Sequence, residues 1–473
     1  MTVQTPSTPG APSPSPTRAR PSTQSAPGNS PLPGVPAPGA PAPGGAPSPG
    51  APTPPDDLPA PFDGDGFQSF TGPASVRYPA PDIARGFMLL LIALANAPFW
   101  MVLFRTRAEV TGADTIWMGL RAAFVDHRSY PLFAMLFGFG LATMARRCTE
   151  AGPRSTAAAA ADADPAASIA ASTSATAATA RSATAGVTPA ATGMNAARRA
   201  APVADARRLI RGRGLWMLVF AAVHGALFMG DIIGAYALIA VVLADPIAGR
   251  GRRTQAVVGG LSTAVCLGYM LYIGWFLSVG GVTVGTAGAA GGGVVGGITE
   301  MLRGPLYPAV SLVLWAGGTM VTILTSLTLP ATLLGVRLAD TDLLTRPDRH
   351  RRALLVGGAA ALVVGALGAL PYMKLGAPAW LIVMGPTLDS LTGMVGACGW
   401  LALLAAWAGP GGGPLRGARW LLSAVGRRSM TVYIGQTVLF VLIFGALRLT
   451  GAPAFNEVMG VFVAVAVWAA LAG

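Results

Sequence analysis

The sequence has few charged side chains and few cysteines, and each shortage excludes a class of protein. Only 11% of its 473 residues are charged, while 52% are hydrophobic and the mean hydropathy is +0.55. Soluble domains carry about 25% charged residues, so the composition predicts an all-α polytopic membrane protein instead. The three cysteines, Cys148, Cys266 and Cys398, have neither metal-ligand spacing nor a disulfide pattern. We therefore expect no metal site and no disulfide framework.

Three segments lack the apolar continuity of a membrane span. Residues 1–80 are rich in Pro, Gly, Ala and Ser and contain no apolar run typical of a signal peptide. They bury too little apolar surface to offset their ordering entropy, which predicts a disordered cytoplasmic tail before a transmembrane helical domain at 81–473. Residues 151–205, rich in Ala, Thr and Ser, predict a disordered cytoplasmic insert within that domain. The glycine run at 285–297 has no Gly-Lys-Ser/Thr ending, so we expect no nucleotide site there.

Apolar runs near the length of a membrane span recur along the rest of the chain. A helix needs about 20 apolar residues to cross a hydrocarbon core of about 30 Å. The second run is short, and Pro386 and Asp389 interrupt the eighth. We predict ten crossings, at residues 83–104, 129–145, 209–229, 231–248, 255–279, 309–336, 352–371, 380–408, 421–446 and 455–473.

The distribution of arginine tests this count, because cytoplasmic connections carry the excess of Lys and Arg. The connections after the second, fourth, sixth and eighth runs contain 22 arginines, whereas the opposite connections contain seven Lys or Arg residues. This bias predicts that both chain ends are cytoplasmic. The net charge of +13 is dispersed between the runs, so we expect a lipid bilayer, and no nucleic acid, as the partner.

The apolar stretch at 215–243 contains one histidine, His224, and one carboxylate, Asp231. An ionisable residue at the centre of a membrane helix costs about 2.5–3.5 kcal/mol, so it usually belongs to a site or caps a helix. One helix of this length would span about 43 Å, which predicts a reversal near 229–231 and a capping role for Asp231. His224 is either a buried neutral imidazole or a catalytic base. We expect His127 and His350 to be solvated.

The first predicted span carries three polar residues. Asp82 and Arg85 stand three residues apart, which places them on one face of a helix. Either Asp82 is the N-cap and Arg85 an interfacial anchor, or the two form a seat for the phosphates of a cofactor. Asn96 lies about 16 Å deeper at 1.5 Å per residue. It either bonds to a neighbouring helix or contacts the reacting groups of a substrate.

The ninth predicted span carries a further polar group. Arg427 precedes the span, and Thr431, Tyr433 and Gln436 lie inside it. Thr431 and Gln436 are five residues apart, so the group is spread round the helix. Hydrogen bonding between helices is the simpler interpretation, and contact with a substrate is the alternative.

Four of these segments together resemble the YeiB-like family of bacterial membrane proteins, also called domain of unknown function 418. They are residues 82–97, 128–142, 219–243 and 424–437. The chain departs from the family pattern at Val432, where members usually have an asparagine, and Arg128 alone supplies the positive charge before the second span. It also stops at Gly473 without the ending of its relatives, which indicates an incomplete reading frame.

The resemblance implies a relationship to the transmembrane acyltransferases, which include the heparan-glucosaminide acetyltransferases and are similar to the acyltransferase-three group. Such enzymes move an acyl group from cytoplasmic acyl-CoA to an acceptor on the far side of the membrane. We therefore expect a multi-pass protein of the bacterial plasma membrane that acylates a hydroxyl or amine of a small-molecule or glycan acceptor. The residues involved would be His224, Asp231 and Asn96 for catalysis, Arg85, Asp82 and Arg427 for acyl-CoA, and Tyr433 and Gln436 for the acceptor.

Two other functions remain open at this point. Ionisable residues and broken spans inside a membrane also mark the substrate pathways of transporters, so a transporter or exporter of a small amphiphile is the alternative. The two halves of the chain show no inverted repeat, which counts against a transporter. The third interpretation is a membrane scaffold without turnover, in which His224 would affect stability alone.

Overall fold

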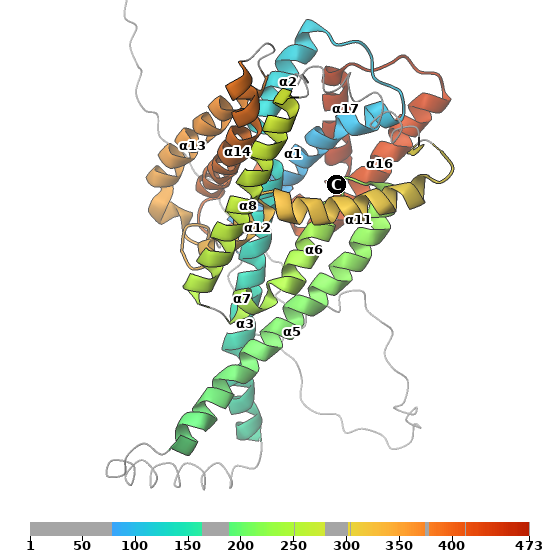
Figure 1. Cartoon of the computed structure of the whole chain (residues 1–473). Helices are drawn as coiled ribbons and strands as arrows, with labels where there is room; N and C mark the ends of the chain where they lie inside the picture. The colour runs from blue at the N-terminus through green and yellow to red at the C-terminus, as the bar shows by residue number, and fades with distance from the viewer. Residues whose placement is uncertain are drawn as a thin grey trace, which may run out of the picture. The chain divides into compact units, whose positions relative to one another are not determined.

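The computed structural model describes residues 78–162, 189–249, 251–279, 301–302, 304–373, 378–411 and 413–472. Residues 1–77 of the predicted tail at 1–80 and the glycine run at 285–297 lie outside these residues. The described residues form helices and contain no β-strand (Figure 1), which confirms the all-α class. The helices are α1 (Pro79–Leu103), α2 (Gly112–Phe124), α3 (Ser129–Asp162), α5 (Pro189–Leu227), α6 (Ile233–Val242), α7 (Ala244–Ala248), α8 (Arg252–Val279), α11 (Tyr307–Thr325), α12 (Thr328–Leu338), the short 3-10 helix η1 (Pro347–His350), α13 (Arg351–Met373), α14 (Ala379–Ala408), α15 (Gly417–Arg427), α16 (Ser429–Leu449) and α17 (Glu457–Ala470).

Each apolar run predicted to cross a membrane is helical over most of its length, but three of the runs are broken. The run at 231–248 forms α6 and α7, which meet at Leu243, and the run at 309–336 forms α11 and α12, separated by Ser326 and Leu327. The run at 421–446 begins in α15 and continues in α16, with Arg428 between the two helices. The described residues thus contain several helices that fit a membrane. Six are long and apolar enough to cross one, namely Pro79–Leu103, Arg252–Phe276, Tyr307–Thr325, Pro347–Leu370, Val383–Ala408 and Ser429–Leu449.

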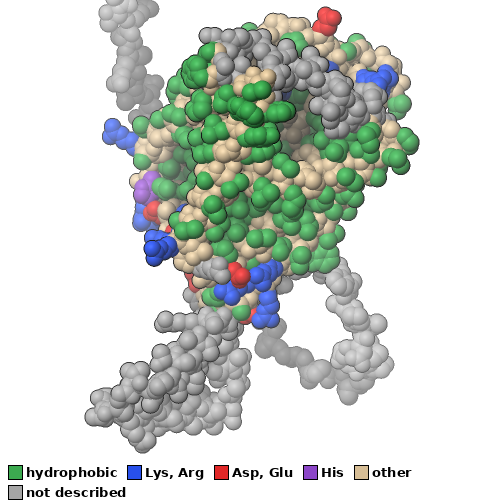
Figure 2. Space-filling model, in the orientation of Figure 1, with side chains coloured by type: hydrophobic (Ala, Val, Ile, Leu, Met, Phe, Trp, Pro, Cys, Tyr) green, Lys and Arg blue, Asp and Glu red, His purple; other side chains and the backbone are tan. Residues whose placement is uncertain are grey.

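Large apolar side chains are exposed on the outer faces of these helices. Trp216 and Val223 on α5 are 68% and 65% exposed, and Val257 on α8 is 63% exposed. Figure 2 shows hydrophobic side chains over most of the viewed face, with Lys and Arg gathered toward its edges. Apolar surface of this extent is typical of a face that contacts lipid or another protein.

Ion pairs join the connections in two separate groups. In one group, Asp340 after α12 pairs with arginines of α3, α8 and α12, and Asp245 of α7 pairs with two arginines of α5. We call the end of the helices that carries these pairs the basic end. In the other group, Glu457 of α17 pairs with Arg107 and Arg121. The arginine-rich connections after the second, fourth and sixth runs therefore meet at one end.

The helix α1 lies inside the bundle and so places its polar residues in the interior. Buried side chains occur along its whole length, and it packs against α3, α14, α15, α16 and α17 (Figure 1). The same core contains fully buried side chains of other helices, including Leu132 and Met135 of α3 and Tyr236 of α6. Polar atoms on α1 must therefore be satisfied by neighbouring helices or by a ligand.

Helix replaces the expected disordered chain at both ends of the 151–205 segment. α3 continues to Asp162, and α5 begins at Pro189. Alanine is frequent in both extensions and is the strongest helix former. This local preference favours helix where the Ala, Thr and Ser content predicted disorder. The middle of the segment, residues 163–188, lies outside the described residues.

Candidate functional site

His224, near the end of α5, lies at the centre of a line of hydrogen bonds. Its Nδ1 atom is 2.8 Å from Oδ1 of Asp231, and its Nε2 atom is 2.8 Å from the hydroxyl oxygen of Thr437 on α16. His224 is 2% exposed, Asp231 6% and Thr437 4%. A hydroxyl, a base and a carboxylate that orients the base are the three parts of a proton-transfer array. We call these three residues the His224 site.

The site lies where the chain reverses, as predicted. α5 ends at Leu227 and α6 begins at Ile233, so residues 228–232 form the turn. From Arg213 to Leu227 the helix is about 21 Å long at 1.5 Å per residue, which is shorter than a hydrocarbon core of about 30 Å. The hydroxyl of Tyr307 on α11 donates to the carbonyl oxygen of Leu227 and so covers the end of α5.

Asp231 caps α6 and orients His224 at the same time. Its Oδ2 atom accepts a hydrogen bond from the backbone N–H of Gly234 at 3.0 Å and another from the indole N–H of Trp315 at 3.0 Å. The N-cap position itself is occupied by Ile232. Asp231 therefore caps α6 from the residue before the N-cap. In the described part of the chain no arginine or lysine pairs with this carboxylate. Its negative charge therefore faces only His224 and neutral donors.

Two glycines allow Trp315 of α11 to reach Asp231. A Cβ atom on Gly225 would lie 2.4 Å from Cγ of Trp315, and a Cβ atom on Gly234 would lie 2.7 Å from its Cζ2 atom. The indole ring therefore occupies the space that side chains on α5 and α6 would need. Ser311, one turn before Trp315, also donates to the carbonyl of Gly225 at 2.7 Å. Small residues thus fix α11 against the α5–α6 hairpin.

Two predicted acceptor-binding residues on α16 have different surroundings. The ring centroid of Tyr433 is 5.0 Å from that of His224, so Tyr433 forms a wall of the His224 site. Gln436 is 3% exposed and its Nε2 atom donates to the carbonyl of Leu89 on α1 at 3.0 Å. Gln436 therefore makes the inter-helix hydrogen bond that was the simpler interpretation. Thr431, in the first turn of α16, is exposed.

Asp82 and Arg85 form an ion pair in the first turns of α1. Nη1 of Arg85 is 3.2 Å from Oδ1 of Asp82, and its Nη2 atom donates to the carbonyl of Leu136 on α3 at 3.4 Å. The prediction that Asp82 is the N-cap is wrong. The helix begins at Pro79, three residues before Asp82, because proline suits the first helical position. The N-cap is Tyr78.

The predicted partner Arg427 ends α15, which packs closely against the start of α1. A Cβ atom on Gly426 would lie 1.8 Å from the carbonyl oxygen of Asp82, and one on Gly86 would lie 2.0 Å from the carbonyl oxygen of Leu422. Only glycine permits this backbone approach. Arg427 follows directly after Gly426 and is exposed.

Asn96 lies apart from the hydrogen bonds of the His224 site. It is half-buried on α1. Within the described residues, His224 and Asp231 bond to each other, to Thr437, to Trp315 and to the N–H of Gly234, and Asn96 takes part in none of these bonds. The predicted catalytic role of Asn96 would therefore act through a bound substrate, since Asn96 does not bond to His224 or Asp231.

Sequence reasoning missed Thr437, Trp315 and a second buried cluster. Arg128, which is 0% exposed, lies 2.9 Å from Oδ1 of Asp389 on α14 and donates to the carbonyl of Gly365 on α13. His127 bonds to the other oxygen of Asp389, so it is paired although its side chain is 44% exposed. Asp389 interrupting an apolar run was the signal for a partner. His350 pairs with Asp342 at 2.8 Å and is partly exposed.

The helices and the His224 site together define a polytopic helical membrane protein with an enclosed histidine–aspartate pair. Residues 338–473 match the family model described as a protein of unknown function, DUF418. This match confirms the predicted resemblance to the YeiB-like family over that segment, which includes Arg427, Tyr433, Gln436 and Thr437. No curated protein and no solved structure matches the chain.

Proposed function

We propose that the chain is a membrane-embedded acyltransferase that moves an acyl group from acyl-CoA to a hydroxyl or amine acceptor. The observation that carries the proposal is the line from Asp231 through His224 to the hydroxyl of Thr437. A proton taken up at Nε2 of His224 would be stabilised by the Asp231 carboxylate, which has no basic side chain as a partner in the described residues. The donor class comes from the family resemblance.

The hydroxyl of Thr437 marks the position that an acceptor hydroxyl would take. His224 accepts the proton of the acceptor at Nε2, and the acceptor oxygen attacks the thioester carbonyl. The carbon–sulfur bond breaks, and the CoA thiolate takes the proton back from His224, so the base is regenerated. General-base catalysis of this kind contributes about 10²–10⁴-fold. Asn96 would contact the thioester carbonyl, while Tyr433 and Gln436 would border the acceptor.

The donor phosphates would bind at the basic end, beside Asp82, Arg85 and Arg427. The guanidinium groups of Arg85 and Arg427 suit phosphate oxygens, and tight packing of α1 against α15 brings them to the same region. We further propose ten crossings of a bacterial plasma membrane with both chain ends on the cytoplasmic side. The arginine bias of the connections and their meeting at the basic end support this orientation.

A transporter of a small amphiphile is the second candidate, and a broken helix favours it. α11 ends at Thr325 and α12 begins at Thr328, in the middle of one apolar run. Broken helices at membrane depth often line substrate paths in transporters. In this chain the break is satisfied locally, because the hydroxyl of Ser326 bonds to the carbonyl of Thr322 at 2.6 Å and to the hydroxyl of Thr328 at 2.6 Å.

The test is CoA release from acyl-CoA by the full chain reconstituted in vesicles, with and without candidate acceptors. We expect His224→Gln to lower kcat by about 10²–10⁴-fold and Arg85→Gln to raise KM for acyl-CoA. Thr437→Val should keep turnover within about tenfold, because Thr437 only occupies the acceptor position. His350→Gln, at a surface ion pair with Asp342, is the matched control and should leave turnover unchanged.

Three results would contradict the mechanism. Full turnover in both His224→Gln and Arg85→Gln would remove it. Loss of all turnover in Thr437→Val, with folding intact, would replace it by a covalent acyl-threonine route. Substrate movement coupled to a proton or sodium gradient, without thiol release, would favour the transporter.

A further inference from the structure

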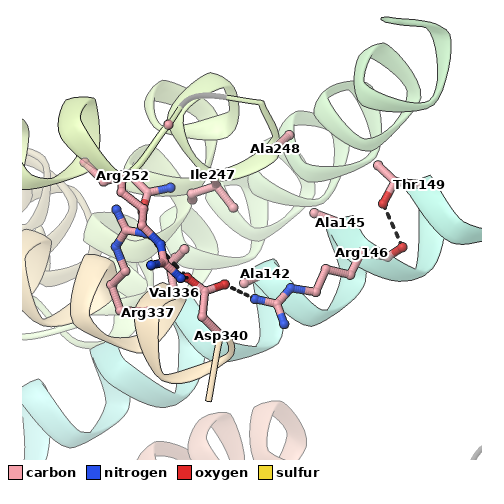
Figure 3. A pocket seen from close by; sticks show the side chains of 12 residues that line it. Ala142, Ala145, Arg146, Thr149, Ile247, Ala248, Arg252, Val336, Arg337 and Asp340 are labelled. Atoms are coloured by element: carbon pink, nitrogen blue, oxygen red, sulfur yellow. Dashed lines mark hydrogen bonds and ion pairs between the residues drawn. The ribbon is translucent and has the colours of Figure 1, made fainter. Parts of the chain in front are cut away.

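A pocket of about 310 Å³ opens at the basic end, between α3, α7, α8 and α12 (Figure 3). Its size is at the lower end of the range for small-molecule sites. Small and apolar side chains line part of it, among them Ala142 and Ala145 of α3 and Ile247 of α7. The rest of the lining is strongly polar. It is separate from the Asp82–Arg85 pair, none of whose residues lines it.

Three arginines from three helices surround one carboxylate in this pocket. Arg146 of α3 bonds both to Asp340 and to the carbonyl of Ala339. Its position is therefore explained by stabilisation of the C-terminal end of α12. Arg337 and Arg252 are 3.4 and 3.6 Å from Oδ2 of Asp340, at or beyond the limit of a good hydrogen bond. Among the described lining residues Asp340 is the sole acidic one. The pocket therefore carries excess positive charge.

A buried side chain of the same pocket lacks a partner. Gln255 is 6% exposed, and its Nε2 atom donates to the carbonyl of Pro246 at 2.8 Å, which fixes the orientation of the amide. Its Oε1 atom has no hydrogen-bond partner among the described residues. A buried acceptor without a partner is destabilising. A donor on a ligand in the pocket would satisfy it.

The first turn of α8 adds a second feature that suits an anion. Gly251 and Arg252, at the start of this 28-residue helix, both line the pocket. The first turn contains no acidic residue. No carboxylate of this turn therefore competes with a bound anion for its backbone N–H groups and partial positive charge.

We propose that this pocket binds a phosphate monoester or diester that carries a hydroxyl or amine next to the phosphate. Arg252, Arg337 and the first turn of α8 hold the phosphate oxygens, and Oε1 of Gln255 accepts the hydrogen bond of the neighbouring group. The ligand is either a soluble phosphate ester or a lipid headgroup with the same chemistry. The site stands whether or not the chain transfers acyl groups, because its binding is measured without turnover.

The test is calorimetric titration of the purified full chain in a neutral detergent at pH 8, with two probes. Glycerol 3-phosphate has a hydroxyl beside its phosphate, and methyl phosphate has none. We expect saturable binding of both, weakened about tenfold or more by Arg252→Gln and by Arg337→Gln. Gln255→Leu should weaken glycerol 3-phosphate alone. Arg211→Gln is the matched control, since Arg211 pairs with Asp245 at 3.0 Å outside the pocket.

Several outcomes would overturn the proposal. These are no saturable binding of either probe, wild-type affinity in Arg252→Gln and Arg337→Gln, equal weakening by Arg211→Gln, or equal weakening of both probes by Gln255→Leu. Short-chain phosphatidylglycerol then identifies the source, with short-chain phosphatidylcholine as the control. Displacement of glycerol 3-phosphate by phosphatidylglycerol alone assigns a lipid headgroup, and no displacement by either assigns a soluble ester. Both results retain the phosphate chemistry.

Discussion

Two histidine–aspartate pairs in the described residues, each with a buried aspartate, have opposite surroundings. In the first, Asp231 holds His224, and its other oxygen accepts two neutral N–H groups. In the second, Asp389 bonds to His127, and its other oxygen is 2.9 Å from the buried guanidinium of Arg128. The imidazole of His224 is enclosed, whereas the side chain of His127 is 44% exposed.

The difference lies in charge balance. Arg128 already compensates Asp389, so the second cluster is neutral when His127 is neutral. Asp231 has no such cation among the described residues, so no arginine or lysine compensates the charge of its carboxylate. A buried charge without a partner is costly. Under the proposed function the first pair would accept a proton, whereas the second pair joins the start of α3 to α13 and α14.

Replacing each aspartate by asparagine should separate these roles and give the largest effects. Asp389→Asn leaves Arg128 buried without its carboxylate, so we expect a loss of about 3–5 kcal/mol in unfolding free energy. In Asp231→Asn the amide oxygen still accepts from Gly234 and Trp315, so stability should fall by about 1 kcal/mol. Its amide N–H would face Nδ1 of His224 and impose the wrong tautomer, which predicts about a 10²–10⁴-fold loss of turnover.

Denaturation in mixed detergent micelles measures the unfolding free energy, and CoA release measures turnover. Arg337→Gln, at an exposed ion pair, is the control for loss of a charge, and its stability should stay within about 0.5 kcal/mol of wild type. The comparison fails if Asp231→Asn costs more stability than Asp389→Asn. It also fails if Asp231→Asn keeps the turnover of the wild-type chain.

Gly225→Ala tests whether the packing of Trp315 holds the first pair together. The new methyl group would lie 2.4 Å from Cγ of the indole, so Trp315 must shift, and we expect a cost of about 1–3 kcal/mol. Gly317→Ala is the matched control on α11, because a Cβ atom there meets nothing within 4 Å. It should be neutral or slightly stabilising. Thermal unfolding followed by tryptophan fluorescence compares the two variants, and equal midpoints would exclude the close contact.

Trp315→Phe isolates the indole hydrogen bond from the packing of the ring. Asp231 loses one donor at 3.0 Å, while an aromatic ring still covers Gly225 and Gly234. We expect a loss of about 1–2 kcal/mol in unfolding free energy and a smaller fall in turnover than in Asp231→Asn. Trp380→Phe, at an exposed ring on α14, is the control for removal of an indole. Equal losses in the two variants would show that the contact with Asp231 contributes nothing.

Much of the fold followed from local sequence pattern, whereas half of the site did not. Apolar runs and their flanking arginines predicted the helices, and helix length predicted the reversal between His224 and Asp231. Thr437 and Trp315 are 213 and 84 residues from their partners. A hydroxyl or indole inside an apolar helix costs little, so neither residue interrupts the hydropathy pattern. Their roles appear only when α11 and α16 pack against the hairpin.

The wrong and incomplete predictions have the same origin. Asp389 was visible as a charge inside an apolar run, but its partner His127 lies 262 residues away and beyond another helix connection. Helix boundaries were displaced where Pro79 begins α1 earlier than the apolar run does. Sequence alone indicates that a buried charge needs a partner. The packing of the helices decides which residue supplies it.

The smallest expected effect is the pH dependence of the second pair. Burial lowers the pKa of His127, but the hydrogen bond and charge of Asp389, with the charge of Asp126, more than offset it, and Arg128 acts in the opposite direction. The net result is a pKa of His127 raised above its ordinary value of 6.5. The stabilisation is therefore complete below about pH 6.5 and is lost as pH rises through the raised pKa.

His127→Gln should consequently be less stable than wild type at pH 6 and nearly equal to it at pH 9. The side chain is partly exposed, so we expect a difference of less than about 1 kcal/mol. Thermal unfolding at a series of pH values and constant ionic strength measures this difference in stability. His350→Gln, at another histidine, is measured in the same way for comparison. A deficit that stays constant from pH 6 to pH 9 would mean that His127 contributes packing and no charge. The contrast between a balanced and an unbalanced aspartate would then rest on Arg128 alone.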